Sequence, residues 1–278
     1  MADFQVLRED MVRRQISARG IRDELVLDAM RTVPREKFVP GQVQEFAYND
    51  HALPIEQNQT ISQPYIVALM TEALQLSEGD RVLEVGTGSG YAAAVLSRIA
   101  EEVFSIERHE YFVQRALEIY EKLGYENIQV RAGDGTLGWP EEGPFDAISV
   151  TAGGPEIPES LKEQLAPGGR LVIPIGSSLQ LQKLVRVTRT GDDQFETEEL
   201  SDVRFVPLIG EQGWKSEDRA SPSTSQGIEG LLEEEANPIS DLKESSLESL
   251  VDRLGEARVV LIGEASHGTS EFYQLRER

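Results

Sequence analysis

One short stretch of the sequence limits the possible folds more than any other. Residues 82–91, with the sequence VLEVGTGSGY, join an apolar run to a helical pattern through Gly86, Gly88 and Gly90. The pattern predicts a β-strand, a tight loop and the start of a helix. Glycines allow positive φ angles and a close approach of a ligand to the backbone, and the N–H groups at a helix start favour a polar or anionic group. A nucleotide-like cofactor is therefore the first hypothesis, and a purely structural turn is the alternative.

Strand and helix patterns alternate after this turn. Strands are expected at 81–86, 102–107, 128–132, 145–151 and 169–175, and helices at 89–100, 110–123 and 157–165. This alternation predicts an α/β fold in which helices cover both faces of a doubly wound, mainly parallel sheet. Two further β-rich runs, 181–190 and 203–209, are separated by the acidic turn 191–193 and predict a C-terminal hairpin at one edge of the sheet.

The segment before the turn is mainly helical. Apolar spacing predicts two N-terminal helices within residues 4–33, the second capped by Asp23, with buried stripes at Leu7, Met11, Ile16, Leu25, Val26, Ala29, Met30 and Val33. Prolines end this pattern at 34–40, because each disfavours helix at the residue before it. A mostly polar loop over 41–63 leads to a helix at 64–76, whose first residue is a proline.

The composition changes near residue 212. Residues 213–237 are rich in Ser, Gly and Glu and poor in apolar residues, so they are expected to link the main domain, residues 1–212, to residues 238–278. The last segment has one strand-like and two helix-like pieces, which are too few to bury a core. It is not expected to be an independent domain.

The chain has a formal net charge of −22 and contains no cysteine. Its acidity disfavours nucleic acid and anionic membranes as partners and is also typical of proteins adapted to high salt. Disulfides and thiol chemistry are excluded.

The N-terminus lacks a secretion signal pattern and no stretch suits a membrane span, so a cytoplasmic protein is expected. His51 and His109 have no partner at metal-ligand spacing, so no metal site is expected, and the oligomeric state cannot be read.

An acidic residue stands where a nucleotide ribose would bind. Glu107 ends the second expected strand, twenty-one residues after Gly86, and Arg108 follows it. In doubly wound folds an acid at this strand tip accepts hydrogen bonds from ribose hydroxyls, whereas the alternative is an ordinary solvated acid. Asp134 and Gly135, at the tip of the third strand, are a candidate contact for an adenine amino group.

The glycine spacing argues against a pyrophosphate ligand. Tyr91 stands where the dinucleotide pattern G-x-G-x-x-G needs its last glycine. Glu84, two residues before the first glycine, would repel a phosphate but suits a cationic cofactor. These features favour S-adenosylmethionine over a dinucleotide.

A polar stretch before the helix at 64–76 is the candidate substrate contact. Thr60, Ile61 and Ser62 precede the helix, so backbone amides and the two hydroxyls can meet a carboxylate. The alternative is ordinary helix capping by Ser62 or Gln63.

Eight short segments form a more specific pattern: VPREKFVP at 33–40, DHALPI at 50–55, QTISQP at 59–64, LEVGTGSGY at 83–91, GDG at 133–135, PFDAI at 144–148, LAPGGRLVIP at 165–174 and RFVPL at 204–208. In this order they resemble the protein-L-isoaspartate O-methyltransferase family. The resemblance implies the Rossmann-like fold of class I S-adenosylmethionine-dependent methyltransferases. The implied substrate is an L-isoaspartyl, or more weakly a D-aspartyl, residue in a damaged protein, whose methyl ester closes to a succinimide and so begins repair.

The resemblance also implies roles for individual residues. Ser62 would contact the substrate carboxylate, with further substrate contacts at Thr60, Ile61, Arg204, Phe205 and Val206. The cofactor would contact Glu84, Gly86, Thr87, Gly88, Glu107, Arg108, Asp134 and Gly135. One departure is the stretch 56–58, Glu-Gln-Asn, where many members have glycines.

A weaker resemblance lies in the tail. VVLIGEASHGTSEF at 259–272 is similar to the opening of erythromycin-esterase-like hydrolases, in which a glutamate and a histidine, here Glu264 and His267, belong to the active site. Only this opening is present, so no hydrolase activity is expected. Two other functions stay open for the main domain: a methyltransferase of the same fold with another acceptor, such as a small molecule, and a ligand-binding module without turnover. The segment 60–64 and the acidic charge favour a protein carboxylate as acceptor.

Overall fold

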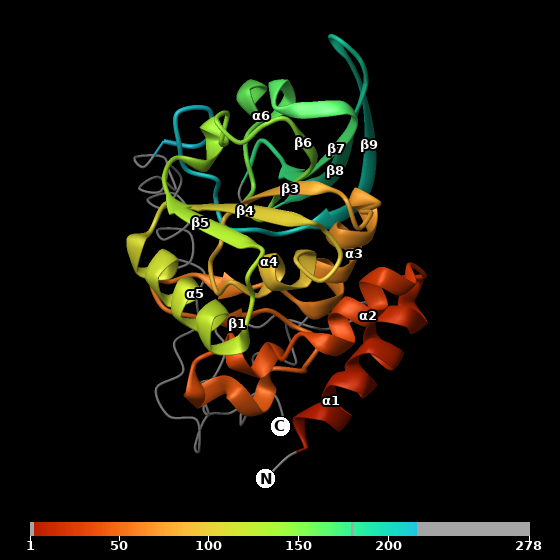
Figure 1. The fold of residues 1–278 in the computed structure, drawn as a ribbon, viewed down its shortest axis with the longest axis vertical. Coiled ribbons are helices and arrows are strands. Elements are labelled where there is room, and N and C mark those ends of the chain that lie inside the picture. Colours follow the sequence, from red (N-terminus) through yellow and green to blue (C-terminus); the bar gives the residue numbers. More distant parts are fainter. Residues whose placement is uncertain (1–2, 179–180, 216–278) are drawn as a thin grey trace, which may run out of the picture. The chain divides into compact units, whose positions relative to one another are not determined.

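A seven-stranded sheet with the strand order β5-β4-β3-β6-β7-β8-β9 forms the centre of the fold (Figure 1). The computed structural model describes residues 3–178 and 181–215. The strands are β3 (Arg81–Val85), β4 (Glu102–Glu107), β5 (Ile128–Ala132), β6 (Phe145–Val150), β7 (Leu165–Ile175), β8 (Gln182–Gly191) and β9 (Gln194–Val203). The strands from β5 to β7 pair in parallel, and β8 and β9 add an antiparallel hairpin. The predicted α/β fold is confirmed.

Hydrophobic side chains on both faces hold the sheet between two helical layers. Val82 of β3 packs with residues of α3 (Pro64–Leu74), α4 (Tyr91–Leu96) and α5 (Glu110–Leu123). Leu83 and Val85 pack on the other face, with Leu161 of α6 (Glu159–Glu163). Figure 1 shows α4 and α5 on one side of the sheet and α6 on the other. Because successive side chains of a strand point to opposite faces, this arrangement buries both faces.

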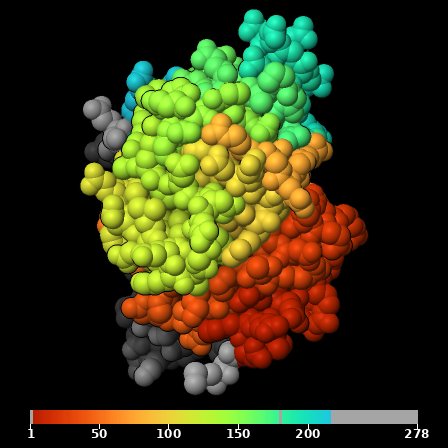
Figure 2. All heavy atoms as spheres, in the orientation of Figure 1, coloured from red at the N-terminus to blue at the C-terminus, as the bar shows by residue number. Residues whose placement is uncertain are grey.

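The N-terminal segment belongs to the same layer as α3. α1 (Phe4–Met11) continues into η1 (Val12–Ile16) and η2 (Ser17–Arg19), and α2 (Glu24–Thr32) follows. The carboxylate of Asp23 accepts hydrogen bonds from the N–H groups of Leu25 and Val26, which confirms the predicted cap. In the space-filling view the N-terminal residues, in red and orange, form a continuous surface with the rest of this layer (Figure 2).

Two expected core residues of this segment are exposed. Leu7 is 36% exposed and Leu25 is 42% exposed, so their predicted burial was wrong. Neighbouring helical residues point about 100° apart, and Val26 occupies the core-facing position beside Leu25. In α1 the residue that is buried in the core is Met11, at the end of the helix.

Several element boundaries differ from the predicted ones. α4 and α6 are shorter than expected, and β7 begins earlier, at Leu165. The second arm of the hairpin is β9, at 194–203, so its predicted placement at 203–209 was wrong. β9 lies at the edge of the sheet and most of its side chains are exposed and polar, so no alternating pattern marks it. Residues after β9 instead run beside the loop that follows β6, where Gly153 and Pro207 form a parallel bridge.

The polar loop contains short elements that shape the functional site. These are η3 (Arg35–Lys37), η4 (Gly41–Phe46), β1 (Leu53–Pro54) and β2 (Thr60–Ile61), and the helix α3 then begins at Pro64. A further short helix, η5 (Gly135–Leu137), follows β5. None of the helices in the described ranges is long and apolar enough to cross a membrane. Most of the predicted linker and the whole segment 238–278 lie outside the described residues.

Candidate functional site

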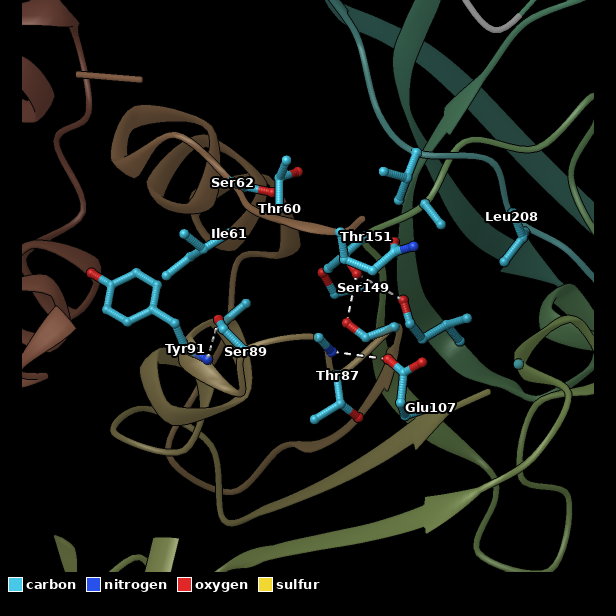
Figure 3. Close-up of a pocket in the computed structure, with 18 of the residues that line it drawn as sticks. Thr60, Ile61, Ser62, Thr87, Ser89, Tyr91, Glu107, Ser149, Thr151 and Leu208 are labelled. Carbon is cyan, nitrogen blue, oxygen red and sulfur yellow. Dashed lines mark hydrogen bonds between the residues drawn. The ribbon is translucent and has the colours of Figure 1, made fainter. Parts of the chain in front are cut away.

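An open cavity lies at the carboxyl ends of β3, β4 and β6 (Figure 3). β3 has β4 on one side and β6 on the other, and the chain builds β4 and β5 before it returns to the other side of β3. Doubly wound sheets bind ligands at such a change of direction, because the connections diverge there. About 1060 Å³ of empty space, part of it open to solvent, is available.

The glycine loop between β3 and α4 forms one wall of the cavity. Gly86, Gly88 and Gly90 have φ angles of +100°, +50° and +86°, which residues with side chains rarely adopt. A Cβ atom at Gly88 would meet no other atom within 4 Å, so a side chain there would extend into open space. The loop therefore presents main-chain groups, together with Thr87 and Ser89, to a ligand.

Tyr120 explains the position of the third glycine. Its hydroxyl donates a 2.9 Å hydrogen bond to the carbonyl oxygen of Gly90. A Cβ atom on Gly90 would lie 2.8 Å from this hydroxyl oxygen, which is too close for a real contact. The dinucleotide pattern would place its last glycine at position 91. Here position 90 needs a glycine, because Tyr120 of α5 packs against the loop at that residue.

Glu107 connects the glycine loop to the neighbouring strand. Its carboxylate accepts 2.9 Å hydrogen bonds from the N–H groups of Gly88 and His109. The residue is 5% exposed and lines the cavity beside Arg108. Each carboxylate oxygen can accept more than one hydrogen bond, so the group can still accept hydrogen bonds from hydroxyl groups of a ligand. The buried Nε2 atom of His109, also at the cavity, has no hydrogen-bond partner in the described part of the chain.

Glu84 lies beneath the loop and does not line the cavity. It is fully buried, and it accepts a 2.5 Å hydrogen bond from Ser105 Oγ, which lies 2.6 Å from Thr87 Oγ1. Burial raises the pKa of Glu84 to about 8, although the bond from Ser105 favours the charged form. Glu84 is therefore mainly neutral at pH 7. A neutral Glu84 does not supply the negative charge that the sequence suggested, and Glu107 is the glutamate that lines the cavity.

Asp134 and Gly135 occupy different positions relative to the cavity. Gly135 lines it, whereas Asp134 does not. The Asp134 carboxylate caps η5 by accepting hydrogen bonds from the N–H and hydroxyl of Thr136, at 2.9 and 2.7 Å. Its other oxygen accepts a 2.7 Å bond from the N–H of Glu211. Asp134 thus fastens the segment after β9 to the end of β5.

The predicted substrate segment forms the opposite wall. β2 pairs with β1 in a short antiparallel hairpin. Thr60, Ile61 and Ser62 all line the cavity, and Figure 3 shows them facing Thr87, Ser89 and Glu107 across it. Ile61 is 3% exposed. The hydroxyls of Thr60 and Ser62 form no hydrogen bond within the described ranges, so both can contact a ligand.

The turn of this hairpin is strained and anchored. Gln57 and Asn58 have φ angles of +56° and +54°, and the N–H of Gln59 donates to the carbonyl oxygen of Glu56 at 3.1 Å. Turns with two consecutive positive φ angles favour Asn and Gly, so Gln57 is an unfavourable residue here. An ion pair between Glu56 and Arg115 of α5 holds the turn against the helix.

The segment after β9 closes a third side. Val206 lines the main cavity, whereas Arg204 and Phe205 line an adjoining cavity that shares Thr60, Ser62, Thr151 and Val206 with it. Arg204 is exposed and forms no ion pair with a described residue. The main-chain bonds Gly153 N–H to Val206 oxygen and Leu208 N–H to Gly153 oxygen, both 2.8 Å, fix this segment beside β6.

Several lining residues were missed in the sequence: Ser89, Tyr91, His109, Ser149, Thr151 and Leu208. Ser149 and Thr151 stand at the end of a predicted strand, and the rule that ligands bind at carboxyl ends would have found them. Thr151 donates 2.7 Å and 3.1 Å hydrogen bonds to the carbonyl oxygens of Gly86 and Val85, which ties β6 to the glycine loop. Leu208 had no such signal, because a distant segment brings it to the site.

The two walls suit two different ligands. One combines a main-chain cradle open at Gly88, the carboxylate of Glu107 and the unpartnered Nε2 of His109, which fits a nucleoside with a positive charge. The other offers free hydroxyls at Thr60 and Ser62, which fit a carboxylate. No group of three or more His, Asp or Glu side chains within 3–178 and 181–215 could hold a metal ion. The arrangement can hold a methyl donor and a carboxylate acceptor side by side.

Comparison with known proteins agrees with this geometry. Residues 6–213 match the family model described as protein-L-isoaspartate(D-aspartate) O-methyltransferase. "Protein-L-isoaspartate O-methyltransferase 2" of Pelobacter propionicus is 61% identical over 207 residues, which cover 74% of this chain and 92% of that protein. "Protein-L-isoaspartate O-methyltransferase 1" of Rhodopseudomonas palustris is 60% identical over 213 residues, which cover 77% and 87%.

Solved structures lead to the same family. A protein-L-isoaspartate O-methyltransferase superimposes with a TM-score of 0.68 at 34% identity, over 74% of this chain and 67% of that one. A Plasmodium falciparum structure, described as a beta-aspartate methyltransferase in complex with S-adenosyl-L-homocysteine, has a TM-score of 0.63 at 29% identity, over 73% and 98%. From the fold, the two-walled cavity and these matches, we conclude that the chain belongs to the protein-L-isoaspartate(D-aspartate) O-methyltransferase family.

Proposed function

We propose that this protein transfers a methyl group from S-adenosylmethionine to the α-carboxylate of L-isoaspartyl residues, and more weakly of D-aspartyl residues, in damaged proteins. The observation that carries the proposal is the shared cavity, in which Thr60 and Ser62 face Glu107 and the glycine loop. In the ester product the neighbouring backbone amide nitrogen attacks the ester carbonyl and methanol leaves, which forms a succinimide; hydrolysis of the succinimide returns some normal aspartate. The partners are therefore proteins or peptides with isoaspartate, and a cytoplasmic location is part of the proposal.

The cofactor half of the site is assigned to the loop and the strand ends. Gly86, Thr87 and Gly88 would lie against the donor, and Glu107 would accept hydrogen bonds from its ribose hydroxyls. Gly135, with Arg108 nearby, would flank the base. Glu84 and Asp134 do not line the cavity, so we propose that they act on the donor only by holding the loop and the end of β5 in place.

The acceptor half of the site is assigned to β2 and the residues that follow it. Ser62 would donate its hydroxyl proton as a hydrogen bond to the substrate carboxylate, with Thr60 beside it. Ile61 is buried and would limit the access of water to the reacting groups. Val206 would contact the substrate, while Arg204 and Phe205 would contact the neighbouring peptide in the adjoining cavity.

The chemistry needs little acid or base assistance. When bound, S-adenosylmethionine supplies a methyl group on a positively charged sulfur that departs as a neutral thioether. The carboxylate is already ionised near neutral pH. The protein therefore acts mainly by orientation, which can contribute up to about 7–11 kcal/mol to a reaction between two held groups.

A labelling experiment tests the function. The protein is incubated with methyl-labelled S-adenosylmethionine and two peptides of one sequence, of which one contains isoaspartate and the other normal aspartate. We expect label that base releases, confined to the isoaspartyl peptide. Equal labelling of both peptides, or none, would contradict the proposal. Labelling of a small carboxylic acid but not of the peptide would favour another acceptor, and binding of the donor without turnover would indicate a non-catalytic module.

The tail carries no part of this proposal. The segment 259–272, with Glu264 and His267, lies outside the described residues. Its similarity to erythromycin-esterase-like hydrolases stays an expectation from the sequence, and we propose no hydrolase activity for the chain.

A further inference from the structure

A buried arginine lies directly behind the acceptor wall. Arg35, the first residue of η3, is 0% exposed. Its Nε atom donates a 2.7 Å hydrogen bond to the carbonyl oxygen of Ala47, and its Nη2 atom donates a 2.8 Å bond to the carbonyl oxygen of Ser62. The guanidinium carbon lies 4.8 Å from the centre of the Tyr91 ring. These contacts join three segments that are distant in the sequence.

The environment of this charge is unusual. Arg35 forms no salt bridge with any carboxylate in the described ranges, and its Nη1 atom is buried without a hydrogen-bond partner there. Burying an uncompensated charge is unfavourable, and an apolar side chain of similar size would fill the space at lower cost. Burial lowers the pKa of Arg35 to about 10, so the group still carries its charge near neutral pH. The fold thus keeps a positive charge next to the main chain of Ser62.

The contacts of Arg35 reach both walls of the cavity. The bond to the Ser62 carbonyl fixes the peptide plane between Ser62 and Gln63, at the point where β2 turns into α3. Tyr91 is the first residue of α4, it is 1% exposed, and it lines the cavity. One guanidinium therefore holds the residue proposed to contact the acceptor and packs against the helix that starts at the glycine loop.

The charge of Arg35 also matters for the kind of substrate. The whole chain carries a net charge of −22, which repels any acceptor that carries a carboxylate. A cation in a buried, weakly screened position acts more strongly on a nearby anion than an exposed cation does. Arg35 supplies such a cation one hydrogen bond away from Ser62.

We propose that Arg35 is a positioning residue for the methyl acceptor: it fixes Ser62 relative to the glycine-loop helix and provides local positive charge for the substrate carboxylate. This inference rests on the proposed function. It assigns a role to the segment 33–40, for which neither the sequence patterns nor the cavity lining had given one. Arg35 itself does not line the cavity, so it does not touch the substrate: it positions Ser62 through the main-chain hydrogen bond, and its charge acts from behind the cavity wall.

The test compares Arg35→Lys and Arg35→Gln with Arg81→Lys. Arg81 is the control, because it also donates to a main-chain carbonyl, that of Glu142 at 2.8 Å, and lies 4.9 Å from the centre of the Phe104 ring, but it is partly exposed and paired with Glu102 and Glu142. It stands at the opposite end of β3, away from the cavity. Lysine keeps the charge of Arg35 with fewer directed donors, whereas glutamine keeps a donor without the charge.

Three readouts separate positioning from general stability: steady-state kinetics with an isoaspartyl peptide, the dissociation constant of S-adenosylhomocysteine by calorimetry, and hydrogen exchange of residues 59–63. We expect kcat/KM to fall about 10- to 100-fold in both Arg35 variants, since small misplacements of reacting groups have effects of that order. Exchange at 59–63 should become faster, while the dissociation constant of S-adenosylhomocysteine changes less than about twofold. Arg81→Lys should leave all three readouts near those of the unchanged protein.

The other outcomes overturn the inference. The inference fails if Arg35→Lys keeps the original kcat/KM. It fails as well if the kcat/KM of this variant and its affinity for S-adenosylhomocysteine fall in proportion to its melting temperature. It also fails if neither Arg35 variant folds in the presence of S-adenosylhomocysteine, because Arg35 would then be needed for the fold and not for the acceptor segment. If the unchanged protein does not methylate the isoaspartyl peptide, the proposed function fails, and the exchange measurement still reports whether Arg35 holds residues 59–63.

Discussion

Two carboxyl groups near the glycine loop differ in their surroundings. Glu107 accepts two main-chain hydrogen bonds at the cavity wall. Glu84 is fully buried, it accepts a hydrogen bond from the hydroxyl of Ser105, and its Oε1 atom is unsatisfied within the described residues. Glu84 is therefore a neutral, structural acid beneath the loop, whereas Glu107 lines the cavity and can face a ligand.

The substitution Glu84→Gln tests this assignment through the pH dependence of stability. The pKa of Glu84 is about 8 in the folded protein and about 4.5 when unfolded, so the folded state binds the extra proton between these values. Stability contributed by this proton is present below about pH 4.5 and is lost as the pH rises toward 8, by up to about 1.4 kcal/mol per pH unit. Glutamine cannot ionise, so we expect the variant to gain stability relative to the unchanged protein as the pH rises from 5 to 8.

Urea unfolding at four or more pH values between 5 and 8.5 measures this difference. The exposed Glu101→Gln serves as the control and should follow the unchanged protein at every pH. Parallel curves for Glu84→Gln and the unchanged protein would show that Glu84 is already ionised in the folded state.

Ser62 is the residue on which the acceptor assignment depends most directly. Its hydroxyl lines the cavity without a partner in the described part of the chain, while its carbonyl is held by Arg35. Loss of a hydrogen bond to a charged group amounts to about 1.5–3 kcal/mol. We therefore expect Ser62→Ala to reduce kcat/KM for an isoaspartyl peptide by about 10- to 100-fold, with little change in the binding of S-adenosylhomocysteine.

Ser97→Ala is a suitable control for this substitution. Ser97 is 8% exposed, its hydroxyl bonds the carbonyl of Ala94 at 2.9 Å, and it does not line the cavity. Turnover by Ser62→Ala equal to that of the Ser97 control would remove the Ser62 hydroxyl from the reaction.

At the scale of elements, burial decides what the sequence could predict. β3 and β6 are covered on both faces, so most of their residues are apolar and buried, and this marks them as strands. β9 is an exposed edge strand of polar residues, and its pairing with β8 depends on a hairpin that no hydrophobic pattern records. The short α4 was predicted too long, because apolar residues continue past Leu96 in turns that helical periodicity cannot distinguish from helix.

The same principle applies to the elements that form the site. The glycine loop and Glu107 could be found because their positions follow from local strand and helix order. The contact between Asp134 and Glu211 spans seventy-seven residues, and the contact between Arg35 and Ser62 spans twenty-seven. Such contacts depend on how loops fold over the sheet. Burial of Glu84, and hence its neutral state, likewise required the packing of α4 against β3 and β4.

At the scale of the whole molecule, the net charge of −22 sets the conditions under which the fold is stable. Many exposed acids lack a basic partner among the described residues, including Glu78, Glu101, Glu121 and Glu126. Self-repulsion of like charges destabilises the compact state. The ion pairs that the surface does contain, such as that between Lys183 and Asp202, offset only part of this repulsion, because exposed pairs contribute little.

Salt should therefore stabilise the protein. The Debye length falls from about 10 Å at 0.1 M to about 3 Å at 1 M ionic strength, which screens repulsion between separated surface acids. We expect the melting temperature to rise with potassium chloride over this range, by about 2–4 °C for each kcal/mol of repulsion removed. A variant with Glu78, Glu101, Glu121 and Glu126 replaced by glutamine should melt higher at low salt and respond less to added salt. If the melting temperature of the unchanged protein stays constant or falls between 0.1 and 1 M, surface repulsion is not what limits its stability, and the acidic composition does not reflect adaptation to high salt.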